Sequence, residues 1–321
     1  MGISSRLPQT APHRSRIVPE QMRAGRLAAM DDAVPMPPLG AHLSVAGGTW
    51  RAVERAVELG CTALQIFTQA PGRWSGRTIS PDEAERFRGE ALAAGLDGVT
   101  FAHAPYLPNP ASGDRRLRRR SLALVADQLE RARVLGLAGL VLHPGAHTGD
   151  GVAVGVARAA SGLTEVLTST PDAPRLLLEV TAGQGTCLGS DFDQLAALLD
   201  GLPAHRTGVC WDTAHLWGAG YELTTDAGWE RVWAEFRAAT GRDHPDLIHL
   251  NDTDVELGSR RDRHQRIGHG QIGTDGFARI VRDPRLRTVP MVLETPKGED
   301  EVTWDREALT LLRGLATPLH T

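Results

Sequence analysis

The sequence predicts an α/β protein of the (β/α)8 TIM-barrel class. Short apolar runs of strand length recur eight times after residue 39, and segments with helical spacing of apolar residues separate them. Alternating strands and helices imply parallel pairing through right-handed crossovers. Eight such units over about 280 residues favour a closed barrel, which needs roughly 250 residues, over an open doubly wound sheet.

Each of the eight candidate strands is a short apolar run that precedes a helical stretch. In chain order they are Gly40–Ser44, Ala63–Thr68, Val99–His103, Gly139–His143, Leu176–Val180, Thr207–Asp212, Leu247–Asn251 and Pro290–Glu294. The first turn, Ala46–Gly48, does not fit the GxGxxG pattern of dinucleotide-binding open sheets. This mismatch weakens the open-sheet alternative, although the strand pattern alone leaves it open.

Amphipathic helices are expected between the strands. Apolar residues recur at i, i+3 and i+7 in two of these segments, and a glycine that can end the helix follows each. They are Trp50, Val53 and Val57 before Gly60, and Leu122, Val125, Leu129 and Ala132 before Gly136.

The N-terminal segment differs from the rest in composition. Residues 1–38 are polar and aperiodic and end in the Pro-rich stretch Val34–Pro38. Such a segment is typical of a flexible leader. We therefore expect a barrel domain at residues 39–321.

Composition narrows the class of protein. A formal net charge of −4 argues against a simple basic nucleic-acid binder. The three cysteines, Cys61, Cys187 and Cys210, form no CxxC pair, which favours a reducing compartment. No apolar run reaches the ~20 residues of a membrane span, and the N-terminus has no apolar core of the ~7–15 residues that a secretory signal requires. We expect a cytoplasmic monomer without membrane contact.

Metal-ligand residue types recur where the strands end. Each alone is often an ordinary hydrogen-bonded residue, but parallel barrel strands point their ends at one mouth, where many buried imidazoles and carboxylates need shared compensation. Five histidines and four carboxylates without cysteine suit Zn2+, with Mn2+ second, and nine ligands suit three ions. They are His103, His143, Glu179, Asp212, His215, His249, Asp262, His264 and Glu294. Three zinc ions would change the net charge of the whole protein from −4 to +2, and the added positive charge would lie at the barrel mouth.

Several long segments between Gly40 and the C-terminus form a recognisable set of motifs. They are Gly40–Gly48, Leu142–Gly145, Glu179–Gly185, Leu188–Gly189, Asp212–His215, His249–Asp252, Gly258–His264, Ile267–Gly268 and Leu293–Lys297. With these motifs the chain resembles endonuclease IV, the family of zinc-dependent abasic-site endonucleases (AP endonuclease family 2), which implies a xylose-isomerase-like barrel.

The resemblance implies a ligand set and a reaction. His103, His143 and Glu179 would hold the first zinc, and His215, Asp262 and His264 the third. Glu179, as bridge and catalytic residue, would hold the second with the remaining ligands, Asp212, His249 and Glu294. Manganese would be an alternative at one site. Hydroxide would attack the phosphodiester 5' to an abasic site in double-stranded DNA, leaving a 3'-hydroxyl and a 5'-deoxyribose phosphate; 3'-blocked ends are a further candidate substrate.

The resemblance also implies DNA contacts. Tyr106 and Leu107 match a pair that wedges into the gap at the lesion, and ordinary loop packing is the alternative. The loop after the second strand departs from the family pattern, with Ala70 for an asparagine and Gly72 for a DNA-inserting arginine. Arg73 would replace that arginine only if the turn re-aims it.

Other features of the DNA surface are ambiguous. Trp74 is either a DNA contact or a core residue, and Asp254 replaces a family lysine with a charge that repels phosphate. Five arginines that open a helix could follow a DNA backbone or form a solvated face; they are Arg115, Arg116, Arg118, Arg119 and Arg120.

Two other functions use the same fold. A metal-dependent sugar isomerase or epimerase needs strand-end histidines and carboxylates around one or two ions, but has no need of Asp262 and His264. A non-catalytic lesion-binding protein would have no reason to retain a full ligand set. The zinc count and cleavage of an abasic duplex distinguish the three.

Overall fold

The computed structural model describes residues 36–317. Most of the predicted leader, residues 1–35, lies outside this range. Met36 packs against the core, and the carbonyl of Pro38 accepts a hydrogen bond from the amide of Met291 at 2.8 Å. The chain therefore contacts the barrel a few residues before the predicted domain start at residue 39.

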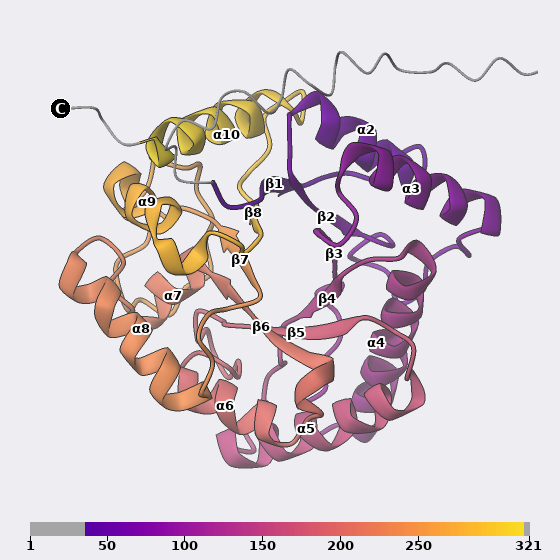
Figure 1. The fold of residues 1–321 in the computed structure, drawn as a ribbon. Coiled ribbons are helices and arrows are strands. Elements are labelled where there is room, and N and C mark those ends of the chain that lie inside the picture. Colours follow the sequence, from indigo (N-terminus) through magenta and orange to yellow (C-terminus); the bar gives the residue numbers. More distant parts are fainter. Residues whose placement is uncertain (1–35, 318–321) are drawn as a thin grey trace, which may run out of the picture. The chain divides into compact units, whose positions relative to one another are not determined.

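Eight parallel strands close into a barrel in sequence order, and helices surround it (Figure 1). This confirms the predicted fold and excludes the open sheet. The strands are β1 Leu39–His42, β2 Ala63–Phe67, β3 Thr100–His103, β4 Gly139–Leu142, β5 Arg175–Glu179, β6 Thr207–Asp212, β7 Leu247–Leu250 and β8 Met291–Leu293. Each coincides with a predicted strand to within two residues.

The helices follow the strands as a barrel requires. They are α2 Trp50–Glu58, α3 Pro81–Ala94, α4 Arg115–Leu135, α5 Val152–Ser169, α6 Phe192–Asp200, α7 Thr213–Ala219, α8 Asp226–Thr240, α9 Gly273–Arg282 and α10 Thr303–Ala316, with short 3-10 turns η1 Ala204–Arg206 and η2 Pro284–Leu286. Within residues 36–317, none of them is long and apolar enough to cross a membrane.

The helix ends follow from local chemistry. The Asp114 carboxylate caps α4 by accepting from the amides of Arg116 and Leu117. Gly136 ends the same helix at φ +70°, a left-handed conformation that glycine adopts without strain. The predicted apolar face of α2 was partly wrong, because Val57 is 59% exposed. The helix packs through the small residues Ala52 and Ala56, beside Val53.

One layer of the core lies inside the barrel. Seven strands contribute one buried residue each to it: Ala63, Phe101, Val141, Leu177, Cys210, Leu247 and Val292. Because strand side chains alternate between the two faces, the residue two positions further along each strand also points inward, nearer the barrel mouth. Those positions determine the functional site.

Candidate metal centre

A polar layer lies directly above the apolar layer inside the barrel. Its members stand two residues after the seven apolar residues: Gln65, His103, His143, Glu179, Asp212, His249 and Glu294. Six of these seven are predicted metal ligands. The site is therefore built by the period-two register of the strands, with a separate strand supplying each group.

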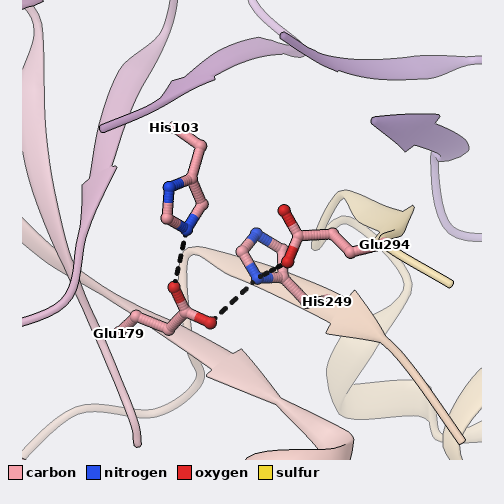
Figure 2. Close-up of side chains that lie close together, drawn as sticks. All are labelled: His103, Glu179, His249 and Glu294. Carbon is pink, nitrogen blue, oxygen red and sulfur yellow. Dashed lines mark hydrogen bonds and ion pairs between the residues drawn. The ribbon is translucent and has the colours of Figure 1, made fainter. Parts of the chain in front are cut away.

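Glu179, at the end of β5, lies at the centre of this layer and is fully buried. Its Oε2 is 2.9 Å from Nε2 of His103 and 2.9 Å from Nε2 of His143. Its Oε1 is 3.1 Å from Nδ1 of His249, and that nitrogen is also 3.1 Å from Oε2 of Glu294 (Figure 2). One carboxylate thus joins histidines from three strands.

Asp212 links the strand layer to a short helix. It ends β6, and its Oδ1 accepts the amide of His215, which fixes the first turn of α7. Nδ1 of His215 then lies 3.2 Å from Oε1 of Glu179. The local Asp–x–x–His spacing therefore places both side chains in the site.

The loop after β7 brings the remaining two predicted ligands to the site. Asp252 holds the loop, because its carboxylate accepts the amides of Gly268, Gly270 and Ile272 at 2.9–3.0 Å. Oδ1 of Asp262 lies 3.3 Å from Nε2 of His215 and 3.5 Å from Nε2 of His264.

The nine predicted residues form one connected cluster, in which three groups bring their ligand atoms within 4.8 Å of one another. They are His103, Glu179, His249 and Glu294; His143, Glu179 and His215; and Asp212, His215 and His264. These groups overlap with the ligand sets implied by the resemblance: Nε2 of His103 and Nε2 of His143 both lie 2.9 Å from Oε2 of Glu179, and Oδ1 of Asp262 lies within 3.5 Å of His215 and His264. Glu179 belongs to two groups, as a bridging ligand would.

The histidines and carboxylates of the cluster shift one another's pKa values toward the charged forms. Burial alone would lower the pKa of His215, but Asp212, Asp262 and Glu179 raise it well above its ordinary value. Burial would raise the pKa of Glu179, but the neighbouring histidines, His143 and His249 foremost, hold it well below its usual range. The buried Glu179 carboxylate is therefore stabilised in its charged form by the histidines that surround it.

Two features fit bound metal ions. Nε2 of His215 and Nε2 of His264 are buried, and neither has a well-aligned hydrogen-bond partner among the described residues. A buried imidazole nitrogen without a partner costs free energy. A cation between these nitrogens and the carboxylates of Asp212 and Asp262 would satisfy both.

Three further polar residues contact the cluster, and the sequence interpretation missed them. Asn251 donates to Oδ2 of Asp212 at 2.6 Å and accepts the amide of Glu294 at 2.9 Å. Gln65 and His42 both contact Oε1 of Glu294. A polar residue inside an apolar strand, such as Gln65 within Ala63–Phe67, was the available signal.

The predicted DNA-contact residues lie on loops beside the site. Tyr106, in the loop after β3, is 72% exposed, and its ring is 5.8 Å from that of Phe67 and 6.2 Å from that of His103. Leu107, the next residue, is half-buried. Tyr106 is therefore not a core residue, and its ring is available at the mouth.

The loop after β2 is held by α4. Gln69 donates to the carbonyl of Arg73 at 2.6 Å, and Gln128 of α4 donates to Gln69 at 2.9 Å. Arg73 is exposed, whereas Trp74 is half-buried with the Arg120 guanidinium 4.1 Å from its ring centroid. A cavity of about 720 Å3 separates this loop from the one after β1.

Comparisons with known proteins agree with the geometry. Residues 53–315 match a family model described as xylose isomerase-like TIM barrel. A protein of Chloroflexus aurantiacus named probable endonuclease 4 is 43% identical over 282 residues, 87% of this chain and 98% of that protein. Its counterpart in Nitratidesulfovibrio vulgaris is 44% identical over 283 residues, 88% and 99% of the two chains.

Solved structures give the same result. Endonuclease IV from Thermus thermophilus is similar with a TM-score of 0.77 and 37% identity, over 87% of this chain and 98% of that one. A D-tagatose 3-epimerase-like protein, with a TM-score of 0.66 and 18% identity over 87% and 98% of the two chains, shares the fold alone. The resemblance predicted from the motifs is confirmed, and the chain belongs to the endonuclease IV family of xylose isomerase-like TIM barrels.

Proposed function

We propose that this protein is a zinc-dependent DNA-repair endonuclease that cuts the phosphodiester 5' to abasic sites. The observation that carries the proposal is the single connected cluster of nine histidines and carboxylates at the barrel mouth. Relatives more than 40% identical over most of the chain are named probable endonuclease 4, which supports a nuclease. The products would be a 3'-hydroxyl and a 5'-deoxyribose phosphate.

The proposed ligands are the nine predicted residues, with Glu179 as the bridge. When bound, zinc supplies Lewis acidity and a nucleophile at neutral pH. The protein contributes fixed geometry: Glu179, Asp212 and His249 are fully buried, so their positions change little when DNA binds. His143, Asp262 and His264 are partly exposed and lie on the side that DNA can reach.

The loops after β2 and β3, at the rim of the barrel mouth, would bind the DNA. We propose that Tyr106 and Leu107 enter the space left by the missing base, because Tyr106 presents an exposed ring 6.2 Å from that of His103. Arg73 and Trp74 would contact the strand beside the lesion. Trp74 is tied to α4 through Arg120, so the loop and the arginines of that helix form one surface.

The arginines of α4 have the placement that phosphate contact requires. A helix that follows a barrel strand starts at the mouth, so the first turns of α4 lie on the rim. Arg115, Arg116 and Arg119 are exposed on one face. Among the described residues, no carboxylate lies within 4.0 Å of their guanidinium groups in an ion pair. We propose that this face follows the DNA backbone.

A duplex with one tetrahydrofuran abasic analogue tests the function. The zinc-loaded protein should cut it 5' to the analogue, and elemental analysis should find about three zinc ions per chain. An intact duplex under zinc-replete conditions would reject the proposal. A sugar epimerase would instead bind one or two ions, and a lesion-binding protein would retain the duplex uncut.

A further inference from the structure

Gln65 is the one member of the polar layer with an uncharged amide side chain, and it is fully buried. It stands two residues after Ala63 on β2, where the register aims it into the barrel at the level of the ligands. A buried amide costs free energy unless its donors and acceptor are satisfied. Its contacts indicate what it does there.

We propose that Gln65 is a positioning residue that fixes the orientation of two metal ligands, His249 and Glu294, from one amide group. The inference rests on the proposed zinc centre. Nε2 of Gln65 is 2.5 Å from Oε1 of Glu294, and Oε1 of Gln65 is 2.9 Å from Nε2 of His249.

The orientation of the amide follows from the chemistry of its neighbours. Nε2 of Gln65 lies beside Oε1 of Glu294, so the NH2 end of the amide faces the carboxylate and donates to it. The carbonyl end then faces His249. Because that oxygen has no hydrogen to give, Nε2 of His249 must carry the proton.

This arrangement selects the tautomer of His249 that a metal ion needs. With the proton on Nε2, the free electron pair of neutral His249 lies on Nδ1. Nδ1 is the atom that faces the cluster, 3.1 Å from Oε1 of Glu179 and 3.1 Å from Oε2 of Glu294 (Figure 2). Without an acceptor at Nε2, the ring could take the other tautomer or turn over.

The same amide contacts only one of the two oxygens of the Glu294 carboxylate. Oε1 is held by Gln65 at 2.5 Å and by Nδ1 of His42 at 3.0 Å. Oε2 is the oxygen that points toward His249 and is left for the metal. Gln65 thus holds the outer oxygen of one ligand and the outer nitrogen of another.

The test measures metal retention rather than cleavage. Gln65→Met keeps the length of the side chain and removes every hydrogen bond. The matched control is Gln128→Met, because Gln128 is also fully buried and hydrogen-bonded through both ends of its amide, to Thr68 and Gln69, but lies on α4 outside the barrel. Gln65→Leu serves as a second variant with different packing.

Zinc release from each holoenzyme to a chromophoric chelator is the first measurement, and the visible spectrum of the cobalt-substituted protein is the second. Loss of an outer-sphere partner typically costs about 10–100-fold in metal affinity. We expect at least tenfold faster release and a changed cobalt spectrum for the Gln65 variants, with both unchanged for Gln128→Met.

Each other outcome overturns the inference. A smaller change in release, an unaltered cobalt spectrum, or equal loss of metal from Gln128→Met would show that Gln65 only supports the fold. If the wild-type protein itself holds no zinc, the proposed function fails with it. Zinc-loaded wild type with unaffected Gln65 variants would reject the positioning role alone.

Discussion

The arginine face of α4 allows a quantitative test of how the protein holds DNA. We expect Arg116→Ala with Arg119→Ala to weaken binding of an abasic duplex and to reduce its salt dependence. Both side chains are exposed on the same side of the helix, so their loss leaves the core of α4 intact. DNA binding by cations releases counterions, and each phosphate contact adds about 0.9 to the slope of log affinity against log salt.

Two lost contacts should therefore lower the slope by about 1.8. The ratio of wild-type to variant affinity should then fall about twelvefold as the salt concentration rises from 50 to 200 mM. The assay is kcat/KM on the abasic duplex across that range, with kcat at saturating DNA unchanged. Arg133→Ala with Arg237→Ala is the matched control, because both arginines lie in the last turns of their helices, away from the mouth. A slope equal to that of wild type, or the same loss in the control, would refute the assignment of this face to DNA.

Three further predictions address the centre, the rim and the scaffold. Glu179→Gln should lower kcat more than about 100-fold and reduce the zinc content, since even outer-sphere partners cost 10–100-fold; near-native turnover would contradict its role as bridge. Tyr106→Ala should raise KM roughly 5- to 150-fold, the loss of about 1–3 kcal/mol of stacking, with zinc content unchanged; an unchanged KM would place the ring outside the DNA path. Hydrogen bonds from Arg77 lower the pKa of Glu83 from 4.5 to about 2, so this pair stabilises the fold above pH 4.5 and loses its effect as the pH falls toward 2. Glu83→Gln should accordingly melt below wild type at pH 7 and approach it at pH 2, and parallel melting curves at all pH values would argue against the ion pair.

Much of the site was predictable because it follows from the register of the strands. Histidines and carboxylates at successive strand ends indicated a shared mouth, and the barrel brings them together. Gln65 was missed because it precedes the end of its strand and is not a metal-ligand type. The two-residue offset from Ala63 would have placed it in the polar layer, but choosing that register requires knowing which face of β2 points inward.

The distances between the ligands could not be derived from residue order. The His103 ring lies 5.5 Å from that of His143 and 5.7 Å from that of His249, and these distances depend on the stagger of strands around the closed barrel. The error for Val57 has a different origin. The predicted face followed only the large apolar residues Trp50, Val53 and Val57, whereas α2 packs through the small residues Ala52 and Ala56 beside Val53.

Under the proposed function, hydrolysis and lesion selection would depend on different parts of the structure. The proposed ligands are built mainly on the strand ends, where a changed side chain disturbs a buried charge network. Most of the proposed DNA contacts lie on loops, where Ala70, Gly72 and Asp254 depart from the pattern that the resemblance implies. Because α4 both holds the loop after β2 through Gln128 and carries the arginine face, it would supply backbone contact in place of that loop. Rim variants should consequently change KM and salt dependence, whereas variants in the polar layer should change metal retention and kcat.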